Sequence, residues 1–315
     1  MKLSVSVITY NHEPYIARAI EGILMQQTDF DYEIVIGEDC STDRTREIVL
    51  DYQMRYPERI RTIIPERNLG QAGLRILVET LRELRGEYIA RMDGDDYWTS
   101  PYKLQRQVEF LDSHPDCSLC FHNVLHIYED GSPPHNRFAP GRQQFTTTRD
   151  ILRSCYIPGC SPMFRREVVA ELPSWFFDVL WADWGLYTIA AEQGKLGYLD
   201  EVMGVYRIHA TGVWSSRPRL DQLEGVIDFY QKVNRGTQYR YADVIAHGLS
   251  RFYSALAATY LEQDDHRQAR DAAWKALRSE PLGRHFRRTD LLRVLAASYV
   301  APARKWLRHR RLRRT

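Results

Sequence analysis

The chain has 315 residues, of which 44% are hydrophobic and 12% aromatic, and its net charge at pH 7 is +2. This length and composition are typical of a globular protein with one large or two modest domains and a sizeable core. The nearly balanced charge excludes strong bulk attraction to an acidic or basic partner. Apart from its last residues, the chain shows no basic stripe of the kind that binds nucleic acid.

Strands and helices alternate over the first hundred residues. Apolar runs and helical periodicity predict strands at 3–9, 32–38, 60–64 and 87–92, and helices at 13–27, 41–56 and 71–84. Such alternation, with strands this apolar, predicts a mostly parallel sheet covered by helices on both faces. In sheets of this kind, ligands bind at the carboxyl ends of the strands.

The pattern changes after residue 115. The sequence predicts a strand at 118–127, a polar loop at 133–148, a strand within 159–169, a helix near 183–193, and short strands near 196–199 and 203–208. From about residue 218 onward the chain is predicted to be helical. Residues 254–281 resemble one helix-turn-helix unit of the tetratricopeptide kind, and because a single copy is evident, a repeat array is not predicted.

The last residues, "ARKWLRHRRLRRT" (303–315), are strongly basic. One interpretation is a solvated helix end. The other is a peripheral contact with anionic lipid, which contributes ~1 kcal/mol per basic residue near the surface. The two interpretations stay open at this stage.

Compartment is predicted from what the sequence lacks. No apolar run approaches the ~18 residues of a membrane span, and the first residues lack the features of a signal peptide. The five cysteines are scattered, and the CxxC formed by Cys117 and Cys120 lies in a strand-like run with no second pair at zinc-like spacing. Buried, reduced thiols are the expected state, so we expect a water-soluble cytoplasmic protein, with a peripheral position on the inner face of the membrane as the variant that the basic tail allows.

Polar side chains follow three of the predicted strands. Thr9, Tyr10 and Asn11 follow the first, and Glu38 and Asp39 end the second. The fourth is followed by three carboxylates within four positions, in the stretch "ARMDGDDYW". Like charges this close raise one another's pKa, so a bound cation would relieve their repulsion.

Three common sites can be excluded for these carboxylates. Counted from Asp93, the twelfth position of a calcium-binding loop is Leu104, where an EF-hand requires Glu. Neither GxGxxG nor GxxxxGK[ST] follows the first strand, which argues against a dinucleotide-binding dehydrogenase and a P-loop NTPase. Asp93 and Asp95 instead suit one hard cation, Mg²⁺ or Mn²⁺, which would bridge the protein to a diphosphate.

Four segments carry a resemblance to a known family. "VSVITYNHEPY", "YEIVIGEDCSTD", "NLGQAGLR" and "ARMDGDDYW" resemble, in order and spacing, the family 2 glycosyltransferases of the GT-A fold. The later stretch "ADWGLYTIAAEQGKLGYLDEVMGVYRIHATGVWS" is similar to the acceptor half of such enzymes. The resemblance covers residues 3–216 and implies a nucleotide-binding half at 1–115, an acceptor half at 116–216, and a helical extension at 217–315.

The resemblance also implies roles for individual residues. The nucleotide would contact Thr9, Tyr10, Asn11, Glu13, Glu38, Asp39, Asn68, Gly70, Asp93 and Gly94. The metal would be held by Asp93 and Asp95 of the DxD motif, with Asp96 and His209 beside them, and Asp183 would be the catalytic base. Trp181 and Trp184 would stack on the acceptor sugar. The chain departs from the family where Cys40 replaces the usual glycine after Asp39, which puts the geometry of that turn in question.

Several of these roles have an ordinary structural alternative, which for Asp95 is a solvated turn carboxylate. Asp183 could cap a helix before Trp184, and both tryptophans could pack in the core. His209 could be a hydrogen-bonded structural histidine.

The resemblance implies a metal-dependent, inverting transfer of a sugar from a nucleoside-diphosphate sugar, with UDP-sugar as the expected donor. The acceptor would be a hydroxyl of a glycan or lipid-linked molecule, in the synthesis of cell-surface polysaccharide or lipopolysaccharide. A non-catalytic sugar-nucleotide-binding scaffold is the alternative. A sugar nucleotidyltransferase is a weaker one, because the glycine-rich phosphate loop of that class is missing.

Overall fold

The computed structural model describes residues 1–280, 291–292 and 294–299. The chain divides into two compact units, Met1–Ser216 and a helical unit from Arg217 onward. The basic segment 303–315, for which a lipid contact was considered, lies outside the described residues. Within the described part of the chain, no helix is long and apolar enough to cross a membrane.

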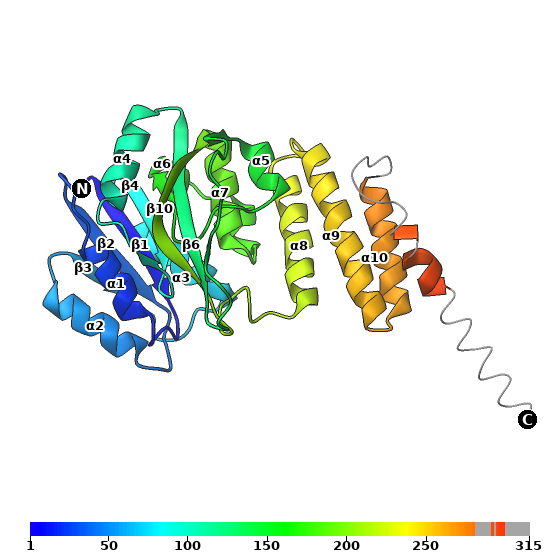
Figure 1. Ribbon diagram of the computed structural model, residues 1–315, viewed down its shortest axis with the longest axis horizontal. Helices are drawn as coiled ribbons and strands as arrows, with labels where there is room; N and C mark the ends of the chain where they lie inside the picture. Colours follow the sequence, from blue (N-terminus) through cyan, green and yellow to red (C-terminus); the bar gives the residue numbers. More distant parts are fainter. Residues whose placement is uncertain (281–290, 293, 300–315) are drawn as a thin grey trace, which may run out of the picture. The chain divides into compact units, whose positions relative to one another are not determined.

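Four parallel strands form one half of the sheet in the first unit (Figure 1). They are β1 (Leu3–Thr9), β2 (Tyr32–Glu38), β3 (Ile60–Ile63) and β4 (Tyr88–Asp93), in the order β3-β2-β1-β4. The connecting helices are α1 (Ile16–Leu24), α2 (Thr45–Arg55) and α3 (Leu74–Glu83), the last preceded by the short 3₁₀ helix η1 (Gln71–Gly73). Because helices cover both faces, β1 and β2 are almost wholly buried along their length, and both are rich in Val and Ile.

The other half of the sheet is mixed. β9 (Met163–Arg165) pairs antiparallel with both β4 and β6 (Cys117–Tyr128), and β6 runs parallel to β10 (Lys195–Ile208). The short strand β5 (Tyr97–Trp98) is the last strand in the sheet order and pairs with β10. The two short strands expected near 196–199 and 203–208 are therefore one strand, interrupted by shifts of register against β6.

Several short elements of this half were not expected. The segment predicted as a loop at 133–148 contains β7 (His135–Asn136) and β8 (Phe145–Thr146), which pair with β6 and β10. It leads into α5 (Thr148–Arg153), where Thr147 and Asp150 form a capping box. The remaining elements of the unit are α4 (Lys103–Ser113), α6 (Glu167–Ala170), the 3₁₀ helix η2 (Ser174–Asp178) and α7 (Ala182–Gln193).

The second unit is helical, as the sequence predicts. Its helices are α8 (Arg219–Gly236), α9 (Ala242–Glu262) and α10 (His266–Ser279). Small residues of α10, such as Ala273, pack with Tyr253 and Leu256 of α9 in a core of its own. Asp265 caps α10 by accepting a hydrogen bond from the backbone N–H of Gln268 at 3.0 Å, which ends the tight turn between the two helices.

Candidate active site

The candidate site lies where several strands of the first unit end. β1, β2 and β4 run parallel, so Thr9, Glu38 and Asp93 at their carboxyl ends lie along one edge of the sheet. β10 ends at Ile208, directly before His209, which the structure brings to the same edge. Residues far apart in the sequence therefore meet at the position where ligands bind in open α/β sheets.

The carboxylate turn after β4 is fastened to β1 and β10. The backbone N–H of Gly94 donates to Ile8 O at 2.9 Å, and a Cβ at Gly94 would come 2.6 Å from Thr9 Oγ1, so only glycine allows this approach. Asp96 Oδ1 accepts the backbone N–H of Arg207 at 2.8 Å, and Arg207 Nε donates to Asp95 O at 3.0 Å. The turn is thus held in place before any ligand binds.

Arg91 joins two carboxylates of the predicted site, a predicted metal ligand and the predicted base. Its guanidinium is 3% exposed, and its Nη2 lies 2.9 Å from Asp93 Oδ1 and 2.8 Å from Asp183 Oδ1. Burial raises the pKa of Asp93 to about 7; the Arg91 charge opposes this rise, while the charges of Asp183 and Asp95 add to it. Sequence reasoning missed Arg91, which looks like an ordinary residue of a buried strand.

Asp183 lies in the first turn of α7, whose N-cap is Trp181. The capping alternative for Asp183 is therefore wrong, because its carboxylate leaves the helix to pair with Arg91. A Cβ built at Gly159 would lie 2.9 Å from Asp93 Oδ2 and 3.4 Å from Asp183 Oδ2. The free oxygens of the two carboxylates consequently face the same small space above Gly159.

Two histidines flank the third carboxylate. Asp95 Oδ2 lies 3.0 Å from His209 Nε2 and 3.7 Å from His12 Nε2. Burial acts to raise the pKa of Asp95, but the hydrogen bond from His209 and the charge on His12 outweigh it, and the pKa falls below its usual range. His209 Nδ1 is in turn 2.8 Å from Thr211 Oγ1, which fixes the ring. His12 was not predicted, although it directly follows the polar cluster after β1.

The turn after β2 is built around Asp39. Its backbone N–H donates to Thr9 O at 3.0 Å, its Oδ1 accepts the N–H of Leu69 at 2.8 Å, and its carbonyl accepts from Asn68 Nδ2 at 2.8 Å. The next residue, Cys40, has a φ of 59°, so it adopts the left-handed conformation that a glycine would have adopted freely. The replacement of glycine by cysteine therefore keeps the turn at a cost of about 1–2 kcal/mol.

The side chain of Glu38 is buried and stabilises this turn from the interior of the protein. Its buried carboxylate accepts the N–H of Ser41 at 2.6 Å and Arg46 Nε at 2.8 Å. Gly70, in the loop after β3, has a φ of 70°, which explains the glycine there.

The loops after β1 and β2 are tied together. Asn11 Oδ1 accepts the N–H of Thr42 at 2.8 Å, and the Glu13 carboxylate accepts the N–H of Arg44 at 3.1 Å. Tyr10 is 41% exposed beside them, which leaves its ring available for a ligand.

The two predicted acceptor tryptophans differ in environment. Trp184 is buried, and its indole N–H donates to Ile151 O at 2.8 Å, so the structure favours the packing interpretation for this residue. The ring of Trp181 lies 4.7 Å from that of Trp214, which is 45% exposed. Trp214 was not predicted as a site residue; its place in the "GVWS" stretch after His209 is the signal that could have identified it.

The donor set suits a hard divalent cation that is shared with a ligand. No group of three metal-ligating side chains is preformed anywhere in the residues that the structure describes. Mg²⁺ commonly takes one or two protein carboxylates and completes its coordination with water and substrate phosphates, and Asp93 and Asp95 can supply those two. Asp96 is buried beneath them and holds the backbone of Arg207, which is a supporting position.

Comparison with solved structures shows the fold. The chain superposes on Staphylococcus aureus TarS, solved with UDP-GlcNAc, with a TM-score of 0.69 at 19% identity, over 97% of this chain and 92% of that one. The Pyrobaculum calidifontis mannosyltransferase PcManGT, solved with GDP-Man and Mn²⁺, gives a TM-score of 0.54 at 20% identity, over 97% and 82%. The fold is that of the GT-A glycosyltransferases.

Sequence comparison gives the family. Residues 4–172 match the model for glycosyl transferase family 2, more than half of the chain, and the protein belongs to that family. Both the expected family and the expected fold class are confirmed.

Two curated relatives illustrate the range of the family. An uncharacterised protein of Mycobacterium tuberculosis is 39% identical over 217 residues, which is 68% of this chain and 61% of that protein. The dTDP-rhamnosyl transferase RfbG of Shigella flexneri is 27% identical over 211 residues, 64% of this chain and 71% of the relative. The match thus spans about three fifths of the mycobacterial relative's length.

Proposed function

We propose that the protein is a metal-dependent inverting glycosyltransferase that moves a sugar from a nucleoside-diphosphate sugar, a UDP-sugar, to a hydroxyl of a glycan or lipid-linked acceptor in cell-surface polysaccharide or lipopolysaccharide synthesis. The observation that carries the proposal is the shared space above Gly159, which the carboxylates of Asp93 and Asp183 both border. A site for the donor diphosphate and a site for a base are adjacent in that arrangement. Residues 1–216 would form the catalytic domain, with 1–115 binding the nucleotide and 116–216 the acceptor.

The nucleotide would lie along the edge formed by the loops after β1, β2 and β3. Tyr10 would offer its exposed ring to the base, and the Asp39 turn, with Asn68 and Gly70 beside it, would shape the base pocket. The nucleotides bound by solved relatives include UDP-GlcNAc in TarS and GDP-Man in PcManGT, so the choice of base is decided by the titration described below.

Asp93 and Asp95 would hold Mg²⁺ or Mn²⁺ together with the donor phosphates. A divalent cation bound there supplies positive charge against the diphosphate of the leaving nucleotide. His209 and His12 orient the Asp95 carboxylate, and Arg91 orients that of Asp93.

Asp183 would act as the general base. Its Oδ1 lies 2.8 Å from Arg91 Nη2, and its second oxygen faces the space above Gly159. There it accepts the proton of the acceptor hydroxyl as that oxygen attacks the anomeric carbon, a contribution of about 10²–10⁴ in rate. Trp181 and Trp214 would form the apolar surface against which the acceptor sugar stacks.

Calorimetric titration tests the donor site. UDP, GDP, dTDP and their sugar conjugates are titrated with Mn²⁺ and with EDTA, into wild type, Asp95→Asn, and Asp51→Asn, an exposed control on α2. We expect one nucleotide family to bind with Mn²⁺ only, weakened in Asp95→Asn and unchanged in Asp51→Asn. Binding of no nucleotide would contradict both the proposed function and the sugar-nucleotide-binding scaffold, and equal binding in EDTA would contradict the metal dependence.

A second test concerns the base. Asp183→Asn should keep donor binding and lose transfer by two orders of magnitude or more. Normal turnover in this variant would remove Asp183 from the mechanism.

A further inference from the structure

A bulge in β10 places two acidic residues outside the regular pairing of the sheet. Leu199 is opposite His122 of β6 and Val202 is opposite Asn123, so Asp200 and Glu201 have no partner on β6. Bulges of this kind redirect side chains that a regular strand would align with its neighbours. Both carboxylates line a pocket beside the strand.

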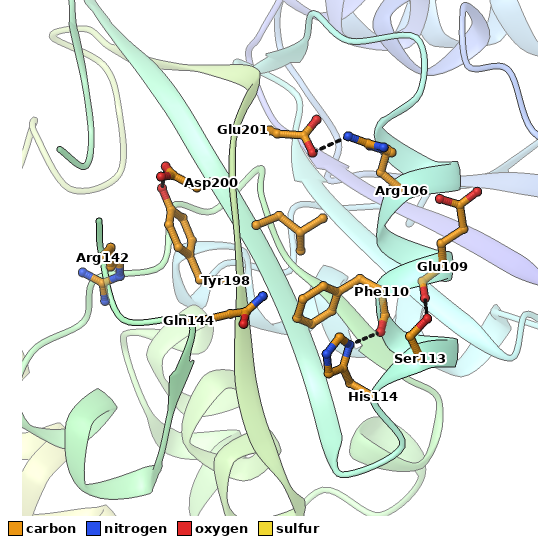
Figure 2. Close-up of a pocket in the computed structure, with 11 residues that line it drawn as sticks. Arg106, Glu109, Phe110, Ser113, His114, Arg142, Gln144, Tyr198, Asp200 and Glu201 are labelled. Carbon is orange, nitrogen blue, oxygen red and sulfur yellow. Dashed lines mark hydrogen bonds and ion pairs between the residues drawn. The ribbon is translucent and has the colours of Figure 1, made fainter. Parts of the chain in front are cut away.

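The pocket lies within the first unit, well away from the catalytic carboxylates. Its volume is about 500 Å³, within the usual range for small-ligand sites. It is bordered by α4, by the segment that precedes β8, and by β10, as Figure 2 shows. Glu201 precedes His209 by eight positions, roughly 26 Å of extended strand, so the two sites are separate.

One wall of the pocket is aromatic. The rings of Phe110 and His114 are stacked, with centroids 4.3 Å apart, and Phe145 lies 5.3 Å from His114. A Cβ at Gly197 would lie 2.3 Å from the Phe110 ring, so this ring rests directly on the glycine backbone of β10. The result is a flat apolar surface next to the bulge.

The opposite rim carries paired charges. Arg106 Nη2 lies 2.7 Å from Glu201, and the Tyr198 hydroxyl donates to Asp200 at 2.9 Å. Each carboxylate keeps lone pairs beyond its single partner, and Figure 2 shows both groups at the pocket.

Arg142 also lines the pocket. Its guanidinium lies 4.2 Å from the ring centre of Phe138 and 4.3 Å from that of Tyr156, and its Nε has no hydrogen-bond partner within the described part of the chain. The side-chain amide of Gln144 adds both a donor and an acceptor to the same pocket.

The charge balance of the lining indicates the ligand class. The lining carries two cations, Arg106 and Arg142, and three carboxylates, Glu109, Asp200 and Glu201, so the pocket favours neither an anion nor a cation strongly. Flat aromatic rings beside closely spaced donors and acceptors suit a molecule with apolar C–H faces and a rim of hydroxyl groups. A neutral sugar ring has both features.

We propose that this pocket is a non-catalytic glycan-binding site, which holds internal neutral sugar units of the acceptor chain while its end occupies the catalytic site. The ligand class rests on the proposed glycan acceptor. The pocket would hold the acceptor chain near the enzyme between transfers, a contribution to effective concentration that needs no contact with the reacting atoms.

Affinity electrophoresis of the full chain tests the proposal. Native gels are cast with neutral polysaccharides (mannan, galactan, rhamnan and glucan) or with an anionic polymer, polygalacturonate. The variants are Asp200→Ala/Glu201→Ala and a matched control, Asp51→Ala/Glu79→Ala, which removes two carboxylates from exposed ion pairs on α2 and α3. Asp183→Asn with Trp181→Ala removes the catalytic acceptor site from the measurement.

We expect at least one neutral polysaccharide to retard the wild type. The apparent affinity should fall at least fivefold in the pocket variant and stay unchanged in both other variants. Equal retardation of the pocket variant, loss of retardation in the catalytic variant, or no retardation by any neutral polymer would overturn the proposal. A change of oligomeric state in the pocket variant, measured by sedimentation, would overturn it in favour of a protein contact.

The nucleotide titration separates this proposal from the proposed function. If the wild type binds a nucleotide and the pocket variant is retarded as strongly as the wild type, only the pocket proposal is contradicted. A wild type that binds no nucleotide counts against glycosyl transfer itself.

Discussion

Lys103 is the first residue of α4, and its side chain is completely buried. Its Nζ lies 3.7 Å from the centre of the Trp98 ring and has no hydrogen-bond partner in the described part of the chain. Burial lowers the pKa of Lys103 to about 7, with the nearby thiols of Cys120 and Cys160 acting weakly in the other direction. A buried ammonium without a hydrogen-bond partner should destabilise the fold, since its contact with the Trp98 ring replaces only part of the lost hydration, and Lys103→Met should relieve this cost.

The size of the effect follows from the pKa. The difference between about 7 in the folded state and 10.5 for an ordinary lysine corresponds to about 5 kcal/mol. Because the folded-state pKa is the lower one, the unfolded chain binds more protons between pH 7 and 10.5. The stability of the wild type therefore rises with pH through that window and is independent of this group below pH 7. Five kcal/mol is an upper bound for Lys103→Met, since methionine must fill the same space.

The assay is urea unfolding followed by tryptophan fluorescence, which reports on Trp98 among others. Lys103→Met should be more stable than wild type by a few kcal/mol at pH 7, and the difference should fall below about 1 kcal/mol at pH 10. Lys195→Met, which changes an exposed lysine paired with Asp116, should have little effect at either pH. A Lys103→Met protein that is less stable at pH 7, or a difference that does not depend on pH, would refute the reasoning.

Two further predictions concern the carboxylates of the candidate site. Gly159→Ala puts a methyl group 2.9 Å from Asp93 Oδ2 and 3.4 Å from Asp183 Oδ2, so it should lower kcat at least tenfold while the urea midpoint hardly moves; an unchanged kcat would contradict the shared space. Arg91→Met leaves the carboxylates of Asp93 and Asp183 without their buried cation, and the fold should lose about 3–5 kcal/mol, as measured by urea unfolding. A variant as stable as wild type would show that Arg91 is not needed to hold them.

The first four strands could be predicted closely from the sequence. β1 and β2 begin and end as predicted, because strands buried on both faces are rich in apolar, β-branched residues. The first helix was predicted too long: 13–27 was expected, and α1 spans Ile16–Leu24. Its flanking residues belong to loops that are held by contacts with distant segments, which local periodicity does not record.

The second half of the domain was harder to predict. β10 reads as two strands because the bulge at Asp200 and Glu201 inserts polar residues between its apolar runs. The short strands β7 and β8 depend on pairing with β6 and β10 and have no strong local pattern. Within the site, the carboxylates could be identified from their spacing in the sequence. Arg91 and His12 could not, because their roles depend on tertiary contacts with these carboxylates.

The hydrogen bonds between the loops after β1 and β2 have a consequence for how the donor is bound. Asn11 and Glu13 hold the backbone of Thr42 and Arg44 in the folded protein itself. Much of the conformational entropy of these loops is then lost during folding, so little of it remains to be lost when a ligand arrives. A nucleotide should meet this wall of the site almost as a rigid template, and weakening these hydrogen bonds should lower its affinity mainly through an entropic penalty.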